Sequence, residues 1–520
     1  MLVPVIIVVA ICVRVVIVRA QPILRTRVIE TLSTRFKSRV DLAELHVWIS
    51  NGVHVSGKGL QIFGTSDPNP WEPGVQSLLE IAEFHFQTPL RNLFREPMHV
   101  DTIYVTGLTL NIPPKRDRLQ MSNLRQRSGK MSIMVDRFVC ADTKIIVNSS
   151  HPAKAPLEFD ISDLRMNDVG PGLPLRFNAT LMNPKPVGNI QSMGQFGPLN
   201  EQSPRDSAVW GTYSFTNADL GTLKGIGGIL SSTGAYAGTL GRIEVTGQTD
   251  TPDFQIASGH RVPLHTQFHA IVDGTDGDTY LDPVMATVLH SSFVANGEVV
   301  RMKNAHGHEI ELDVAMDKAS IEDLLKLGVK TDPPLMTGAV AMRTKLRLLP
   351  GAADVANRLR LDGAFHISKG HFSNESVQQR IDSLSLRSQG KPKLARAHDE
   401  ADVDSDLQGT FALRHGVLTF PLLHFQIPGT HANLTGQYSL DGNIFDFHGM
   451  LRLDAKLSQM TSGWKSILLK PVDPFFHKHG AGTEVPFKIT GTHEEPRFGL
   501  EFRHRTERSH VDREDPTALR

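Results

Sequence analysis

Short runs of alternating apolar and polar residues dominate the chain beyond residue 40. Clear examples are Val53–Gly57 with Leu60–Ile62, and Ile103–Gly107 with Leu108–Ile112. Alternation with a period of two predicts strands that have one apolar and one polar face. In the second example the apolar side chains change from odd to even positions at Gly107, which predicts a bulge or a bend there.

The same alternation continues through the C-terminal half. The pattern predicts two or three strands within residues 408–429, and it continues through residues 434–453. Strands are also expected on both sides of a turn at 273–278, within 260–284. The chain is therefore expected to be mainly β.

One internal repeat stands out. Ile243–Ile256 and Phe487–Leu500 both read apolar-x-apolar-Thr-Gly-x4-Pro-x-Phe-x-apolar. A strand, a turn with Gly and Pro, and a returning strand are the units of a hairpin. We expect two related sheet segments, each closing with such a hairpin.

Helical signals are few. Ser320–Asp323 resembles a capping box in front of an apolar run, Val377–Leu386 predicts a second helix, and Thr222–Ser231 a short third. Residues 184–207 and 391–406 are polar enough to be long loops. The charged residues from 503 onward are expected to form a tail.

The N-terminus carries an apolar run broken by Arg14 alone. An uncleaved transmembrane anchor over 1–21 is favoured over a signal peptide, since no A-x-A-like cleavage site is evident. Basic residues follow the run, so charge bias alone places the body in the cytoplasm, although large domains can cross against that bias. The anchor residues are Leu2, Val5, Ile6, Val8, Val9, Ile11, Val13, Val16 and Ile17.

A basic juxtamembrane helix is predicted over 22–39. Its apolar residues recur every three to five positions, and its arginines could lie either against anionic head groups or in solvent. A second candidate for membrane contact lies near the C-terminus. Its residues suit either a membrane interface or a cap on the end of the sheet, and they are Met460, Trp464, Ile467, Leu468, Phe475 and Phe476.

Charge and motifs narrow the function. Lys plus Arg and Asp plus Glu are 55 each, which gives no basic footprint for nucleic acid. The 23 histidines form no H-E-x-x-H motif, and no paired C-x-x-C or G-x-S-x-G occurs. We therefore expect no catalytic residue, no cofactor and no metal, and a protein that is not an enzyme.

The two ends of the chain resemble the AsmA-like family of bacterial inner-membrane-anchored envelope proteins, related to TamB and to bridge-like lipid-transfer proteins. The resemblance is carried by Arg39–Leu45, Gly57–Ile62, His99–Ile112, Lys470–Phe476 and Val485–Gly491. It implies a long twisted antiparallel sheet, curled into an open trough with an apolar inner face. It also implies a single-pass inner-membrane protein whose body lies in the periplasm.

These expectations divide the chain into an anchor (1–21), a basic helix (22–39), two AsmA-like β regions (40–258 and 259–502) and a flexible tail (503–520). The implied function is to carry or guide phospholipid between the inner and outer membranes, with other envelope proteins as possible partners. A non-enzymatic scaffold or assembly factor for outer-membrane proteins is the alternative. The lipid groove is expected to include Ile103, Val105, Leu108, Leu110, Ile112, Phe411, Leu413, Phe420, Phe425 and Ile427.

Overall fold

A computed structural model of the chain describes most of the region between residues 22 and 500. The described residues are 22–34, 38–63, 77–89, 91–92, 97–112, 133–148, 157–170, 172–184, 186–200, 203–256, 259–301, 308–329, 331–351, 353–397, 402–440, 444–456, 460, 483–492 and 495–500. The expected anchor over 1–21 and the tail from 503 lie outside this set.

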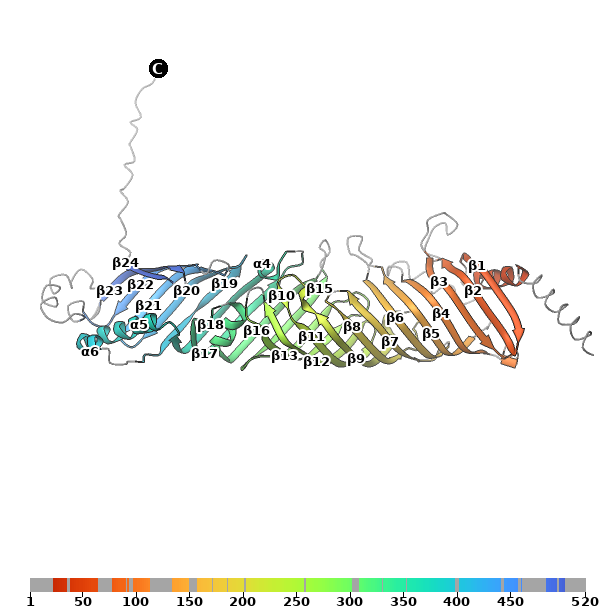
Figure 1. The fold of residues 1–520 in the computed structure, drawn as a ribbon, viewed down its shortest axis with the longest axis horizontal. Coiled ribbons are helices and arrows are strands. Elements are labelled where there is room, and N and C mark those ends of the chain that lie inside the picture. Colours follow the sequence, from red (N-terminus) through yellow and green to blue (C-terminus); the bar gives the residue numbers. More distant parts are fainter. Residues whose placement is uncertain are drawn as a thin grey trace, which may run out of the picture. The chain divides into compact units, whose positions relative to one another are not determined.

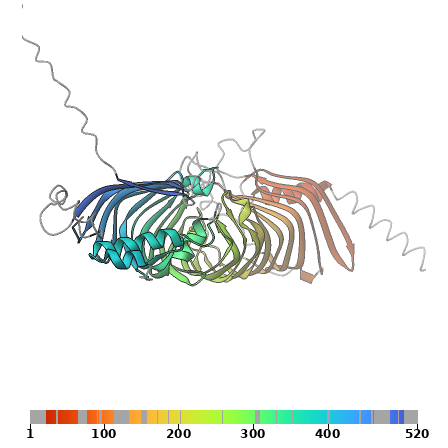
Figure 2. The same cartoon turned by 60° about the vertical axis from the view of Figure 1, so that its left-hand side comes forward.

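The protein is mainly β: strands make up 69% of the residues that the structure describes, and helices are few among them, as the alternation predicts. It divides into two compact units, Met1–Asp332 with Val340–Gly363, and Pro333–Ala339 with Ala364–Arg520. Within each unit the strands form a curled open sheet (Figures 1 and 2). Residues 259–332 thus belong to the first unit.

Among the described residues, the first unit holds sixteen complete strands. They are β1 (Val40–Ser50), β2 (Gly52–Phe63), β3 (Ser77–Thr88), β4 (Met98–Ile112), β5 (Ile133–Val147), β6 (Leu157–Val169), β7 (Leu175–Pro184), β8 (Val187–Phe196), β9 (Ala208–Asp219), β10 (Ile226–Gly227), β11 (Ile229–Thr239), β12 (Arg242–Ile256), β13 (Val262–Val272), β14 (Thr279–Val288), β15 (Ser291–Arg301) and β16 (His308–Ser320).

The second unit holds β19 (Ser405–Arg414), β20 (Val417–Ile427), β21 (Thr430–Ser439), β22 (Ile444–Leu453), β23 (Thr483–Thr492) and β24 (Pro496–Leu500). Strands β17 (Met336–Leu348) and β18 (Leu359–Phe372) contribute residues to both units. The helical elements are residues 22–34, η3 (Pro204–Asp206), η4 (Leu220–Thr222), α3 (Ile321–Gly328), α4 (Val355–Arg358), α5 (Glu375–Ser388) and α6 (Pro392–Ala397).

Apart from β10, which pairs with β12, strands that are neighbours in the chain within one unit are also neighbours in its sheet. In the first unit β1 to β9 and β11 to β16 pair in sequence, and all these pairs are antiparallel except β4–β5. The exception follows 20 residues (113–132) of connecting chain, and a parallel pair needs a long connection of this kind. In the second unit β19 to β24 are antiparallel throughout.

The change of parity at Gly107 is confirmed, and it extends well beyond β4. Gly107 has a φ of 67° and lies opposite Ala82, while pairing on either side keeps one register. Gly59 (φ 61°) lies opposite Ala43 in the same way, and Asp142 (φ 56°) follows on β5. The strands from β1 to β5 therefore bend together, and apolar side chains on both sides of the bend stay on one face.

The two copies of the sequence repeat fold differently. Phe487–Leu500 forms the predicted hairpin, in which β23 pairs with β24 and Gly491 lies opposite Pro496. Ile243–Ile256 is instead a single strand, β12, because β11 and β13 pair along both of its sides. The hairpin prediction is wrong for this first copy, where the register shift between Thr251 and Phe254 accommodates the proline.

Of the other local predictions, some are confirmed and some are wrong. Helices α3 and α5 occur where expected, but Ser320 makes no side-chain cap at α3. Two predictions are wrong, since residues 222–231 contain β10 and the start of β11, and residues 184–207 contain β8. Helix α6 and the start of β19 occupy parts of the loop expected over 391–406.

Candidate lipid-binding faces

The candidate site in the first unit is one face of its sheet, which we call the apolar face. Residues directly opposite each other on neighbouring strands share a face. Three rows of such residues cross the sheet, and no Asp, Glu, Lys, Arg or His stands in them. The central row is Leu45, Gly57, Phe84, Val105, Cys140, Leu164, Ala179, Ser192, Tyr213, Gly234, Gly247, Phe268, Val284, Ala295 and Val314.

The two flanking rows are equally free of charge. One is Val47, Val55, Phe86, Ile103, Phe138, Met166, Phe177, Gly194, Gly211, Tyr236, Val245, Ala270, Leu281, Gly297 and Leu312. The other is Leu42, Leu60, Ile81, Leu108, Thr143, Ile161, Leu181, Ile190, Phe215, Ser232, Thr249, Thr266, Ala286 and Phe293.

Burial separates this face from the opposite one. In β4 the apolar-face residue Val105 is 4% exposed, whereas its neighbour Tyr104 is 44% exposed. Along β11 and β12 most residues of the apolar face are half-buried and those of the other face are exposed. Because this apolar surface is only half-buried, a ligand that covers it stabilises the complex by about 25 cal/mol for each Å² of apolar area removed from water.

The densest part of the apolar face lies over β2 to β6. Ile81, Val105 and Cys140 form a buried core cluster, and partly buried residues such as Phe84 and Phe138 pack against it. Burial raises the pKa of the Cys140 thiol, against which the Thr143 hydroxyl donates a hydrogen bond at 3.0 Å. This cysteine is accordingly a packed core side chain.

The sequence-predicted groove residues of the first unit lie together. Ile103, Val105, Leu108 and Leu110 share the apolar face, because the bend at Gly107 reverses their parity in step with β3. Ile112 pairs with Val147 at the end of β4.

The second unit has its own uncharged apolar face. One row across it contains Phe420, Gly436, Phe447, Ile489 and Phe498. Phe420 and Phe447 approach each other over Gly436, with ring centroids 5.7 Å apart. Phe365 lies 6.1 Å from both Phe411 and Phe420. These spacings are typical of packed aromatic side chains.

The predicted groove residues of the second unit differ in accessibility. Phe420 and Phe425 are half-buried, which leaves part of each ring open. Phe411, Leu413 and Ile427 are 7%, 5% and 2% exposed, so they belong to the packed core of the face. Helix α5 contributes to the cover on this unit, since Ser385 donates to the Pro428 carbonyl and Arg380 lies over the Phe498 ring.

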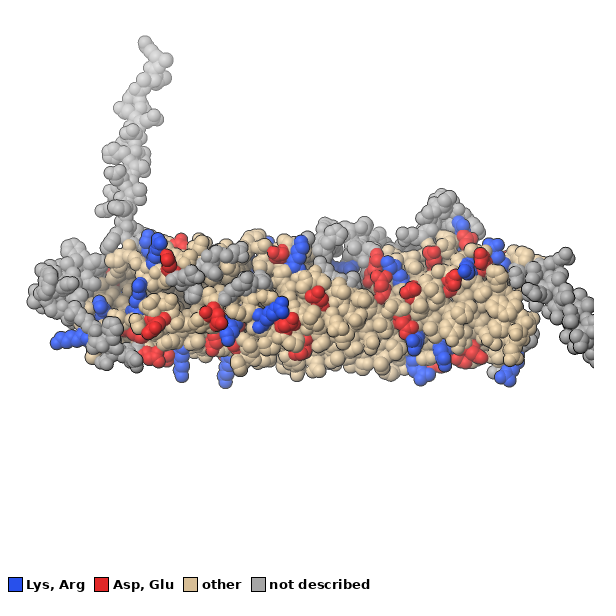
Figure 3. Space-filling model, viewed as in Figure 1, with Lys and Arg blue, Asp and Glu red and all other residues tan. Residues whose placement is uncertain are grey.

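Polar side chains occupy the opposite face. Ion pairs cross neighbouring strands there, for example Lys58–Glu83 and Lys144–Glu158. Figure 3 shows charged side chains on either side of an uncharged stretch over β7 to β9. Most exposed residues of β7 to β9 are neutral, among them Met193 and Trp210, whereas Arg176 of β7 and Asp219 of β9 are exposed and charged.

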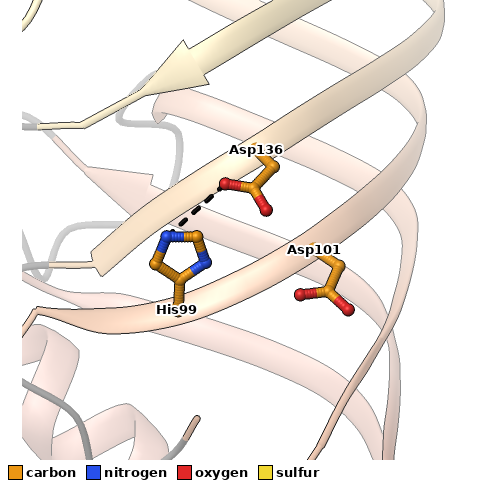
Figure 4. A group of neighbouring side chains, drawn as sticks. All are labelled: His99, Asp101 and Asp136. Carbon is orange, nitrogen blue, oxygen red and sulfur yellow. Dashed lines mark ion pairs between the residues drawn. The ribbon is translucent and has the colours of Figure 1, made fainter.

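One group of potential metal ligands occurs among the described residues. His99 and Asp101 on β4 lie near Asp136 on β5, and His99 Nε2 is 3.5 Å from Asp136 Oδ1 (Figure 4). Both carboxylates are exposed, and Asp101 already accepts a hydrogen bond from Asn92. We therefore assign no metal here. The histidines at 265 and 269 also face strand neighbours, Asp250 and the Asp282 carbonyl.

The membrane-directed predictions fall largely outside the described residues. The anchor residues and Trp464, Ile467, Leu468, Phe475 and Phe476 lie there, while Met460 is described and half-buried. Of the helix expected over 22–39, residues 22–34 are helical and residues 38–39 are not, and Ile23 is 64% exposed. Among the helices that the structure describes, none is long and apolar enough to cross a membrane.

Hydroxyl-bearing residues within the apolar face were not predicted. Tyr213 and Tyr236 form hydrogen bonds with Ser232 and Ser192 there. The signal that could have found them is a repeated Gly-x-Tyr, at Gly211–Tyr213 and Gly234–Tyr236, since residues two apart in a strand share a face.

Comparisons with known proteins add nothing to this geometry. No family model matches the chain, and neither the curated proteins nor the solved structures include a match.

Proposed function

We propose that the protein is a non-enzymatic, membrane-anchored envelope protein that carries or guides phospholipid along its apolar faces, between inner and outer membranes. The observation that carries the proposal is the uncharged, half-buried face that extends from β1 to β16 in the first unit. Acyl chains need only a continuous apolar surface, whereas a charged side chain within it would remain unpaired on desolvation.

Two observations support the proposed membrane anchoring. The helix over 22–34 exposes Ile23, Leu24 and Val28, and it follows an apolar N-terminal run in the sequence. Arg25 fixes this helix to the sheet by donating from Nε to the Leu42 carbonyl at 2.6 Å. A helix that combines exposed apolar and basic side chains suits a membrane surface.

A transfer assay tests the proposal with a matched pair of variants on β20. Phe420→Glu places a charge on the apolar face of the second unit, while Leu422→Glu places one on the opposite face, where Leu422 is 45% exposed. We expect Phe420→Glu to slow phospholipid transfer between vesicles by at least about tenfold, given the cost of a desolvated carboxylate, and Leu422→Glu to leave it near wild type. Equal rates for the two variants would refute the proposal.

The alternative function, a scaffold for outer-membrane proteins, has one observation in its favour. Among the residues that the structure describes, β1 pairs with β2 alone, so its other edge offers backbone groups for β-augmentation apart from the Leu42 carbonyl, which accepts from Arg25. Crosslinking from exposed β1 residues distinguishes the functions, because a scaffold yields an outer-membrane protein as the crosslinked product.

A further inference from the structure

The middle of the first unit's apolar face departs from its surroundings in one respect. Over β8 to β13 it carries a group of hydroxyl side chains, which we call the hydroxyl belt: Ser192, Tyr213, Ser232, Tyr236, Thr249 and Thr266. Apolar residues continue on both sides of it, such as Phe177 toward β7 and Val284 on β14.

Glycines hold the two tyrosine rings flat against the sheet. A Cβ atom at Gly211 would lie 2.6 Å from Tyr236 Oη, and one at Gly247 would lie 2.7 Å from Tyr213 Oη. A Cβ at Gly234 would also meet the Tyr213 ring, at 2.6 Å. Larger residues at these positions would lift the rings, so the glycines fix where the phenol oxygens lie.

Hydrogen bonding sets what the tyrosines can offer to a ligand. Ser192 donates to the Thr212 carbonyl (3.2 Å) and Ser232 to the Gln248 carbonyl (2.9 Å). Each serine has one hydrogen, so Tyr236 must donate to Ser192 (2.7 Å) and Tyr213 to Ser232 (3.1 Å). Both phenol oxygens therefore keep acceptor lone pairs, and both tyrosines are only half-buried, so a ligand can reach them.

The surroundings of the belt exclude charge. No charged side chain stands in its rows, and burial raises the pKa of Tyr236, which keeps this phenol neutral. A phosphate or carboxylate placed here would lose water without gaining a counter-ion. An uncharged donor such as an alcohol would lose less and would gain a hydrogen bond to a tyrosine oxygen.

We propose that the hydroxyl belt binds the uncharged, hydroxyl-bearing end of an acyl lipid of the diacylglycerol class, with Tyr213 and Tyr236 accepting its hydrogen bonds. The inference rests on the proposed function, because the acyl chains of the same lipid must lie on the neighbouring apolar residues. The hydroxyl belt selects a lipid by its polar end, whereas the rest of the apolar face does not discriminate between acyl chains.

The test compares two lipids that differ in one donor. Dioleoylglycerol and its acetylated form, which lacks the free hydroxyl, compete against one fluorescent acyl probe on the full chain, delivered from uncharged detergent micelles. The variants are Tyr213→Phe with Tyr236→Phe, which keep the rings and both serine–carbonyl bonds. Tyr280→Phe is the control, since Tyr280 lies on the opposite face and is 48% exposed.

We expect wild type and Tyr280→Phe to prefer the hydroxyl lipid by about tenfold, the size of one to two neutral hydrogen bonds. The double variant should bind both lipids alike, at the affinity of the acetylated form. A preference that survives in the double variant, or none in wild type, would overturn the belt while leaving acyl binding intact. Failure of both lipids to compete would overturn the proposed function as well.

Discussion

The coordinated bend across β1 to β5 should depend on a glycine at 107. Gly107 combines two demands, a left-handed φ of 67° and a close approach to β3, where an added Cβ would lie 2.8 Å from the Ala82 Cβ. A left-handed conformation costs an L-residue about 1–2 kcal/mol. Crowding a packed site costs about 1–3 kcal/mol more.

Gly172 separates the two costs. Its φ of 73° is similar, but a Cβ there would meet no atom within 4 Å. Because alanine also restricts the unfolded chain, which returns about 0.4–1 kcal/mol, we expect Gly172→Ala to cost about 0–1 kcal/mol. Gly107→Ala should cost about 2–3 kcal/mol, and adding Ala82→Gly should recover much of that difference.

Hydrogen exchange measures these costs locally, through the opening free energy of amides in peptides around each site, from β4 and β5 for Gly107 and from β6 and β7 for Gly172. A local measurement suits a chain of two units, for which a single unfolding transition cannot be assumed. Equal costs for Gly107→Ala and Gly172→Ala would refute the role of the close contact. So would the absence of any recovery in the double variant.

Three further predictions concern single side chains. Asp323→Ala should destabilise the α3 region by about 2–4 kcal/mol, because the buried carboxylate (3% exposed) accepts from the His290 amide and the Ser291 hydroxyl; Asp323→Asn, which keeps one acceptor, should lose less in the same hydrogen-exchange measurement. In a Cys12→Ser background, the Cys140 thiol (0% exposed) should react with a thiol reagent only after unfolding. Because folding raises the pKa of this thiol, its contribution to stability is intact below pH 9 and falls as pH rises above that value. Cys140→Ala should therefore flatten the decline of the urea-denaturation midpoint at alkaline pH, and an unchanged decline would contradict this. Arg380→Ala should raise exchange in α5 by an amount equal to about 0.5–1 kcal/mol, because it removes the cation over the Phe498 ring at 5.5 Å; no change in α5 would show that other contacts alone hold it.

Period-two alternation was enough to predict the class of the fold, and together with the parity change at Gly107 it predicted one groove for Ile103, Val105, Leu108 and Leu110. It succeeded because each strand has one apolar and one polar face, the condition under which alternation is informative. The parity change at Gly107 predicted a local bend. That the bend continues through Ala43, Gly59 and Asp142 follows from strand register, which a single strand's sequence does not contain.

The failures have related causes. The sequence predicts a loop where β8 lies because the residues that β8 contributes to the apolar face include Ser192 and Gly194, which weaken the apolar alternation. The first Thr-Gly-x4-Pro segment was predicted as a turn, but pairing partners on both sides keep β12 extended. Gly247 within it lies beneath Tyr213, so this glycine serves packing on the apolar face.

Alternation within single strands also limited the prediction of the candidate site. Alternation identified apolar positions but could not distinguish accessible ones from core, so buried Ile427 and half-buried Phe420 looked equivalent. The hydroxyl belt was missed because its residues come from separate strands and are joined only by cross-strand pairing.

Native mass spectrometry of the full-length protein, released from detergent just before measurement, tests lipid carriage most directly. The uncharged faces predict that phospholipid co-purifies with the chain, with more than one molecule bound per protein, and that Phe420→Glu binds fewer than Leu422→Glu. A protein that emerges free of lipid, with both variants identical to it, would contradict lipid carriage and favour the scaffold.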